Sequence, residues 1–285
     1  MLTPPAAGKA ALPAWIVLIV ATAIIAAIVL LGPTLAGKLA AMVLTGDGSD
    51  AGFEALFTLI VSGAMLIAAI AGIILCRERA VLGTRPWLGF PVGLLLGSGG
   101  LGLAVAYAAL AGAVVPLVAR PDPLMLIAGL GVVLLQVAAE EAYFRGWLQP
   151  VLARVWGAPA AVAVTALVFA LVHCLGGARA PLTLVNLLLG GVWFGLLALR
   201  GGGIARAAGA HFGWNAAEQL LLGLDPNPGV GSFGSVFDLD LVGSALWGGS
   251  AEGLNASLAM TMALVVLVAP LLIHRRLRSP APAMA

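Results

Sequence analysis

The chain has 285 residues, of which 62% are hydrophobic and only 9% are charged. A water-soluble core cannot bury so much apolar surface, so the composition excludes an ordinary soluble protein and predicts that lipid is the main solvent. The formal net charge of +2 is too small and too scattered to build a basic stripe, which excludes nucleic acid as a partner. The two cysteines, Cys76 and Cys174, lie in separate apolar segments and favour neither a disulfide framework nor a cysteine-based zinc site.

Apolar segments long enough to cross a bilayer follow one another along the chain. A hydrocarbon core of ~30 Å takes roughly 20 helical residues. Eight segments approach this length, at about 14–32, 52–76, 89–118, 123–154, 158–176, 181–199, 203–223 and 256–274. The first is longer than the apolar part of a cleaved signal peptide, so we expect it to be retained. The sequence therefore predicts an all-α fold, a polytopic transmembrane bundle of about eight helices.

Basic residues are distributed unevenly between the two sides of this predicted bundle. With both termini in the cytoplasm, the inner side holds Lys9, Arg77, Arg79, Arg85, Arg154, Arg200, Arg206, Arg275, Arg276 and Arg278. The outer side holds only Lys38, Arg120 and Arg179, and the long loop 223–253 contains no Lys or Arg. Cytoplasmic loops are enriched in these residues, so we expect a multi-pass membrane protein with both termini cytoplasmic. The Ala-, Gly- and Leu-rich composition is typical of GC-rich bacterial genes and favours a bacterial inner membrane.

Charged side chains at membrane depth cost ~2.5 kcal/mol or more each on insertion scales, so they usually have a function or a partner. The fourth segment contains Glu140, Glu141 and Arg145. Glu141 and Arg145 are four residues apart, share one helix face and can neutralise each other. Glu140 is rotated by about 100° from Glu141. The pairing therefore leaves one carboxylate available for chemistry.

Two further segments carry hydrogen-bonding groups that can reach the same level. A turn predicted at Gly157 makes the fourth and fifth segments an antiparallel hairpin, and Glu140 and His173 are equidistant from that turn. In the seventh segment, His211 and Asn215 are four residues apart on one face, ~12 Å and ~18 Å into the helix. We therefore expect three helices to share one site.

Such a site supports the activation of water. A carboxylate and an imidazole, here Glu140 and His173, can deprotonate water for attack on a carbonyl. A second imidazole and an amide, His211 and Asn215, can donate to the oxyanion that forms. Alternatively, Glu140, His173 and His211 supply the two-histidine, one-carboxylate set of a catalytic zinc site. The residues alone leave both alternatives open.

Three motifs in this region resemble a known family, the CAAX proteases and bacteriocin-processing enzymes (the CPBP or Abi family). Members of this family are eight-helix intramembrane peptidases with Glu-Glu-x-x-x-Arg, Phe-x-x-x-His and His-x-x-x-Asn motifs. The matching positions here are Glu140, Glu141 and Arg145, then Phe169 and His173, then His211 and Asn215. The similar block extends from about residue 124 to 222.

The resemblance implies hydrolysis of peptide bonds within or near the membrane. It assigns water activation to Glu140 and His173 and oxyanion binding to His211 and Asn215. The supporting residues it implies are Glu141, Arg145 and Phe169. Family members have been described both as metalloproteases and as metal-independent, glutamate-dependent enzymes, so one divalent metal, zinc, remains an alternative at Glu140, His173 and His211.

The predicted function is thus that of an intramembrane peptidase whose partners are membrane lipid and a membrane protein or peptide substrate. We do not expect prenylated substrates. The alternatives are a catalytically silent immunity or partner-binding membrane protein and a proton-coupled transporter. We interpret 1–120 as three N-terminal transmembrane helices with loops, 121–223 as the catalytic core helices, and 224–285 as an outer loop, a last transmembrane helix and a basic tail.

Overall fold

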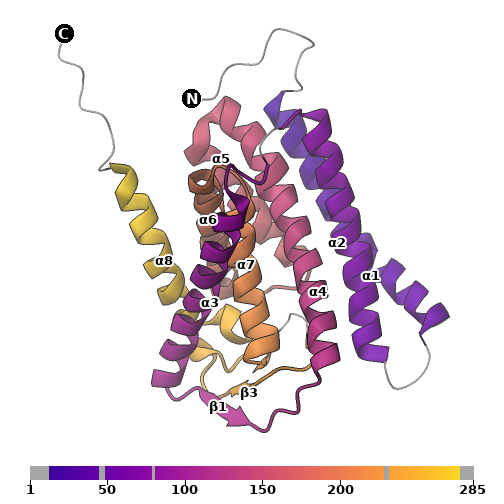
Figure 1. Cartoon of the computed structure of the whole chain (residues 1–285), viewed down its shortest axis with the longest axis vertical. Helices are drawn as coiled ribbons and strands as arrows, with labels where there is room; N and C mark the ends of the chain where they lie inside the picture. Colours follow the sequence, from indigo (N-terminus) through magenta and orange to yellow (C-terminus); the bar gives the residue numbers. More distant parts are fainter. Residues whose placement is uncertain (1–12, 45–48, 79–80, 228–230, 277–285) are drawn as a thin grey trace.

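The computed structural model describes residues 13–44, 49–78, 81–227 and 231–276, and these form a helical bundle with a small sheet at one end (Figure 1). The α-helices are α1 (Ala14–Val43), α2 (Ser49–Leu75), α3 (Pro86–Leu110), α4 (Pro123–Glu141), α5 (Gln149–Leu175), α6 (Pro181–Gly201), α7 (Ala205–Ala216) and α8 (Leu258–Arg276). Two π-helical turns, η1 (Ala142–Leu148) and η2 (Ala217–Leu221), continue α4 and α7. The predicted all-α membrane fold is confirmed.

Within the described ranges, five helical stretches are long and apolar enough to cross a membrane: Ala14–Val43, Asp50–Leu75, Pro86–Leu110, Pro123–Leu175 and Pro181–Gly201. The fourth stretch comprises α4, η1 and α5, while α8 contains a shorter apolar helix, Leu258–Ile273. The expected span at 203–223 is not among them, because α7 and η2 together form a helix of only 17 residues, 12 in α7 and 5 in η2. A helix this short is better suited to the interior of a bundle than to a lipid-facing position.

The boundaries of two predicted segments change in the structure. The third segment was expected to be helical to residue 118, but α3 ends at Leu110 and Val114–Leu117 form strand β1. Gly112, at φ 73°, provides the left-handed conformation that turns the chain between them. The first segment is longer than expected, since α1 continues past Pro33 to Val43.

A short three-stranded sheet covers one end of the bundle. Its order is β1-β3-β2, where β2 is Leu224–Asp225 and β3 is Asp238–Leu241. β1 pairs antiparallel with β3, and β2 pairs parallel with β3. We call residues 223–257, which contain β2, β3 and the short 3₁₀-helices η3 (Ala245–Trp247) and η4 (Gly253–Ala256), the cap.

The opposite end of the bundle gathers basic residues. Arg154 pairs with Glu78, and Arg200 donates to the carbonyl oxygen of Leu271 in α8. The beginning of α1, the turn within α5 and the end of α8 lie at this same end in Figure 1. Basic residues that the sequence assigns to one side therefore share one end of the molecule.

α4 and α5 form the hairpin that positions the predicted site. The chain reverses at Gly157, whose φ of 79° and ψ of 159° interrupt the helix and are readily adopted by glycine. Phe144 packs on Phe169 at 5.3 Å between ring centroids, and Thr165 donates to Gln149 at 3.4 Å. Both pairs are equidistant from the turn in sequence, so the antiparallel register expected for Glu140 and His173 is present.

Glycines let the central helices approach closely. A Cβ atom on Gly93 or Gly97 of α3 would lie within about 2 Å of a backbone oxygen of α7, at 2.1 and 1.9 Å. Gly209 and Gly213 of α7 leave similar space for the backbone of α3, at 2.1 and 2.4 Å. Close backbone approach through small residues is how membrane helices associate. α7 is thereby fixed against α3 on both sides of His211.

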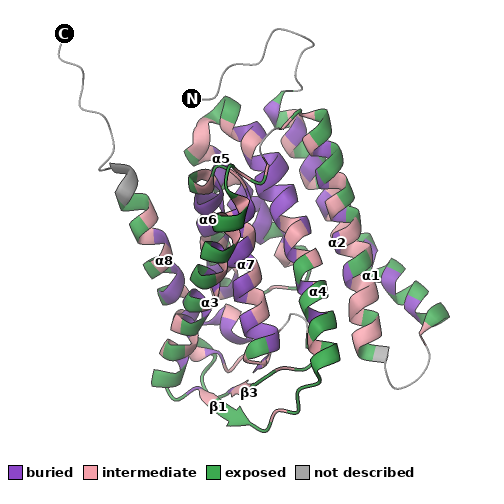
Figure 2. Cartoon of the chain, in the orientation of Figure 1, coloured by how far each residue is buried: buried purple, intermediate pink, exposed green. Residues whose placement is uncertain are grey.

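Burial separates a lipid-facing shell from an interior that contains η1 (Figure 2). All seven residues of η1 are buried. By contrast, large apolar side chains on α1, α2 and α3 are exposed, among them Leu31, Ile67 and Leu95. Exposed apolar residues over whole helices suit contact with lipid tails. The charged residues of η1 and the end of α4 are therefore enclosed by protein and do not face lipid.

Candidate functional site

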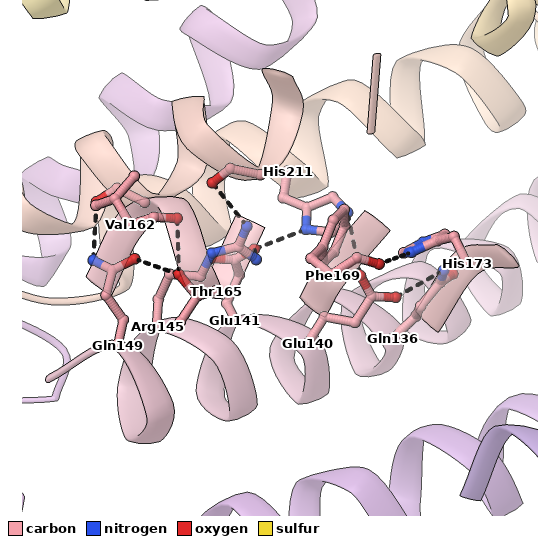
Figure 3. A network of polar contacts seen from close by, with 12 residues as sticks. Gln136, Glu140, Glu141, Arg145, Gln149, Val162, Thr165, Phe169, His173 and His211 are labelled. Carbon is pink, nitrogen blue, oxygen red and sulfur yellow. Dashed lines mark hydrogen bonds and ion pairs between the residues drawn. The ribbon is translucent and has the colours of Figure 1, made fainter. Parts of the chain in front are cut away.

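The centre of the site is an ion pair that is removed from solvent. Arg145 Nη1 lies 2.9 Å from Glu141 Oε1, and both side chains are fully buried. The same Glu141 oxygen lies 3.0 Å from Nδ1 of His211 in α7. The predicted pairing of Glu141 with Arg145 is thus present, and it extends to His211. One carboxylate ties α4, η1 and α7 together (Figure 3).

Arg145 is held by a carbonyl group and by aromatic rings as well. Its Nη2 donates to the backbone carbonyl of Gly191 in α6 at 3.2 Å. Its guanidinium lies over the rings of Phe169, at 4.9 Å, and Phe194, at 5.5 Å. Cation–π contacts are stronger where water is excluded. The arginine therefore has little freedom to leave Glu141.

Glu140 lies outside the pairing of Glu141 with Arg145, as its rotation on the helix predicted, although both glutamates face His211. Its Oε1 accepts a hydrogen bond of 3.3 Å from Nε2 of Gln136, one turn earlier on α4. Its Oε2 is buried and accepts no hydrogen bond from the described residues. This oxygen lies 3.8 Å from Nε2 of His211. Glu140 thus has one anchored oxygen and one free oxygen.

His173 enters the site from the far end of α5. Its Nδ1 lies 2.8 Å from the carbonyl oxygen of Phe169. Because a carbonyl oxygen only accepts, Nδ1 must carry the proton, and in the neutral imidazole Nε2 keeps a lone pair. The ring of Phe169 lies 4.5 Å from that of His173 and 6.3 Å from that of His211, between centroids. Phe169 therefore contacts both histidines.

His211 is buried, and both its ring face and its two nitrogens are in contact with other side chains. Its ring stacks on Phe194 of α6 with 4.5 Å between centroids and an angle of 17°. Its two nitrogens face the two glutamates described above, Nδ1 toward Glu141 and Nε2 toward Glu140. An imidazole that donates through Nδ1 to Glu141 keeps Nε2 directed at the free oxygen of Glu140.

Asn215 is less tightly integrated than the other predicted residues. It lies one turn after His211 on α7 and is half-buried. Its side chain makes no hydrogen bond within the described residues. The structure therefore brings Glu140, Glu141 and His211 into direct contact, while Asn215 shares only the helix face of His211.

The metal alternative at Glu140, His173 and His211 stays a prediction. Among the described residues, no group of three or more His, Cys, Asp or Glu side chains is placed to hold an ion. Nδ1 of His173 is held by a carbonyl oxygen and Nδ1 of His211 by Glu141, which is also how the second nitrogen of a metal-binding histidine is usually held. Nε2 of His211 and Oε2 of Glu140 are 3.8 Å apart, close to the separation of two ligands that each lie about 2.0–2.2 Å from one zinc ion.

Sequence reasoning did not find Gln136, Phe194 or the carbonyl of Gly191. Gln136 could have been found, because it is four residues before Glu140 and such pairs share a helix face. Phe194 and Gly191 lie on α6, which carries no ionisable residue at this depth. Their contribution depends on how α6 packs on α5, where a Cβ on Gly191 would lie 2.9 Å from Ala166 Cα.

The comparison with protein families agrees with this geometry. Residues 122–217 match the family model described as type II CAAX prenyl endopeptidase Rce1-like. The matching segment extends from the beginning of α4 to the first residue of η2 and contains every predicted site residue. It confirms the resemblance to CAAX proteases and supports a CAAX-type intramembrane protease in general. Searches of curated proteins and of solved structures found no match.

Proposed function

We propose that this CAAX protease-like chain is an intramembrane endopeptidase that hydrolyses a membrane protein or peptide with water activated by Glu140. The observation that carries the proposal is the free carboxylate oxygen of Glu140, buried and 3.8 Å from Nε2 of His211. A water molecule cannot fit between atoms at this distance, but one lying to the side of both can hydrogen-bond to each at about 2.8 Å. Such a water would be held beside the base that deprotonates it.

In the first step, Glu140 Oε2 accepts a proton from the water while the water oxygen attacks the substrate carbonyl. The carbonyl π electrons move to its oxygen and form a tetrahedral oxyanion. When the carbon–nitrogen bond breaks, the proton held by Glu140 passes to the leaving amine, which restores the carboxylate. Atoms and charge balance without a further reactant, and one carboxyl group serves as base and then as acid.

His211 is the group that we assign to the oxyanion. When protonated, its imidazolium donates through Nδ1 to Glu141 and through Nε2 toward the reacting centre. Donors fixed before the reaction stabilise a developing negative charge most strongly in a site without bulk water. The Glu141–Arg145 pair fixes the ring, and the amide of Asn215, one turn further, is a second donor on the same face.

His173 assists from the other strand of the hairpin. Its Nε2 lone pair can accept a proton from the water or return one to the leaving amine, because Nδ1–H is committed to Phe169. The contact of Phe144 with Phe169 across the hairpin supports a position of His173 at the level of Glu140. A carboxylate and an imidazole at one level give the site two groups that move protons.

The test compares the purified wild type with Glu140→Gln and His173→Ala on a library of membrane peptides in detergent, with products identified by mass spectrometry. Glu78→Gln, at the basic end of the bundle, is the control outside the site. We expect product from the wild type and the control and a strong loss in both site variants. Equal product from all four proteins would contradict the proposal, and peptide binding without any product would favour the silent, partner-binding alternative.

Zinc is tested in the same preparation. We expect chelator-treated protein without bound metal, measured by elemental analysis, to retain its activity, because the described side chains do not converge on an ion. Loss of activity on chelation and recovery with zinc would assign Glu140, His173 and His211 as ligands instead.

We also propose that the basic end of the bundle faces the cytoplasm of a bacterium and that the cap faces outward. The grouping of Arg154 and Arg200 at one end and the acidic cap at the other supports this orientation. Cysteine labelling from each side of the membrane tests it, with Ser244→Cys, at an exposed position of the cap, as the outer reporter. Labelling of that position only after the membrane is permeabilised would mean that the cap faces the cytoplasm.

A further inference from the structure

Glu218 is a buried carboxyl group that the proposed reaction does not use. It lies in η2, with 5% of its surface exposed, and makes no hydrogen bond or ion pair with the described residues. It follows directly after the segment 122–217 that matches the CAAX protease family. An ionisable residue at membrane depth is costly, and π-helical turns are frequent at functional sites. Glu218 therefore lacks the internal partner that Glu141 has.

Two faces of α7 are occupied by other contacts. Gly209 and Gly213 pack against the backbone of α3. Phe212 and Ala216 line an apolar cleft of about 320 Å³ between α3 and α4, which contains Ser98 as its polar residue. The residues named here on these two faces carry no charge.

The remaining stripe of α7 and η2 is polar and begins in the proposed active site. His211, Asn215 and Glu218 are separated by four and three residues, the spacing of one helix face. His211 marks the direction of this face, because its ring contacts Glu141 and Phe194 in the interior. Glu218 thus continues the active-site face toward the cap.

The distance along this face fits a peptide subsite. Seven residues at 1.5 Å each put Glu218 about 10 Å from His211 along the helix. An extended peptide advances roughly 3.3–3.6 Å per residue. A substrate that runs along α7 would therefore bring the side chain three residues from its scissile bond to Glu218.

We propose that Glu218 determines specificity by binding a Lys or Arg side chain of the substrate, three residues from the scissile bond on the side toward the cap. This inference rests on the proposed peptidase function. Lys and Arg carry a cation on an apolar stem, and such a stem suits the apolar surroundings of η2, in which Ala217 and Leu220 are buried. A buried carboxylate without an internal partner gains most from such a cation.

The experiment first identifies the scissile bonds of a membrane peptide by mass spectrometry. Peptides with Lys, Gln or Glu three residues before or after the bond are then compared by kcat/KM for the wild type, Glu218→Gln and Glu218→Lys. We expect the wild type to cleave the Lys peptide at least tenfold better than the Glu peptide at one of the two positions. Glu218→Gln reduces this preference below twofold, and Glu218→Lys inverts it. Gln219→Leu, an adjacent buried residue rotated to another face, keeps the wild-type preference.

The outcomes separate this inference from the peptidase proposal. A wild type that cleaves no peptide contradicts the proposed function itself. A wild type that cleaves all three peptides equally, with the same profile in Glu218→Gln, overturns the role of Glu218 and leaves the peptidase intact. Glu218→Lys does not need to match the wild-type rate, because inversion is read as a ratio within one protein preparation.

Discussion

Two adjacent glutamates in the same helix have opposite surroundings. Glu141 is fully buried and shares one oxygen between Arg145 and His211, at 2.9 and 3.0 Å. Glu140 keeps an oxygen that accepts no hydrogen bond from the described residues and lies 3.8 Å from His211, and its other oxygen meets the amide of Gln136. A rotation of about 100° between neighbours on a helix is enough to produce this difference. Adjacent acidic residues can therefore divide into one that holds the fold and one that remains reactive.

The comparison predicts different losses when each glutamate is changed. A group that serves proton transfer should affect rate and leave stability almost unaltered. A group that neutralises a buried cation should affect stability, and rate only through the position of His211.

Glu140→Gln is expected to have the largest effect. It keeps the size of the side chain and the Gln136 contact but removes the base, so kcat should fall by about 10²–10⁴-fold. The thermal midpoint in detergent should stay within a few degrees of the wild type. A variant that unfolds at a much lower temperature would show that Glu140 is structural, as Glu141 is.

Arg145→Met tests the buried ion pair of Glu141. It leaves Glu141 buried with His211 as its remaining partner, and loss of one member of a buried pair costs about 3–5 kcal/mol. We expect a lower free energy of unfolding, measured by denaturant titration in detergent or bicelles, and impaired activity.

The double variant Glu141→Gln with Arg145→Met is the matched control. It removes both charges together, so much of the stability should return. Activity should stay low, because His211 loses the carboxylate that orients it. Full recovery of activity in the double variant would contradict the positioning role of Glu141.

Much of the site could be predicted because its polar residues recur at helical spacing. The four-residue separations of Glu141 from Arg145 and of His211 from Asn215 identified shared faces, and the turn at Gly157 set the register of the hairpin. Phe194 could not be predicted in this way. It acts through the packing of α6, and an aromatic residue among many apolar residues has no distinguishing pattern.

The fold could be predicted in class but not in every boundary. Hydropathy alone does not separate a helix from a short strand, so Val114–Leu117 was assigned to the third helix. The same limit affects α7, which is apolar but too short to cross a bilayer. Its position inside the bundle follows from Gly209 and Gly213 packing against α3, a property of the assembled helices.

Gln136→Leu tests the hydrogen bond that holds one oxygen of Glu140, and its expected effect is smaller. The hydrogen bond from Gln136 fixes one oxygen of Glu140, and a bond to a charged group contributes about 1.5–3 kcal/mol. At the lower end of this range kcat should fall about tenfold, with KM unchanged because Gln136 orients the base and does not hold the substrate. Stability should change little. Gln219→Leu serves as the control, and an equal fall in kcat there would contradict a specific role for Gln136.

Glu252 extends the comparison to a carboxylate in the cap, with the smallest expected effect. Partial burial raises the pKa of Glu252, but the Thr183 side chain, the backbone N–H groups of Ala180 and Arg179 and the positive charge of Arg179 outweigh it and hold the pKa below its ordinary value. A depressed pKa means that the carboxylate stabilises the fold above its ordinary pKa and that this contribution disappears as pH falls through the depressed value. Glu252→Gln should therefore lower the thermal midpoint by a small amount at pH 7, and the difference from the wild type should vanish toward pH 3. Melting curves that stay separated by the same amount at both pH values would mean that the ionised form of Glu252 does not hold the cap on the beginning of α6.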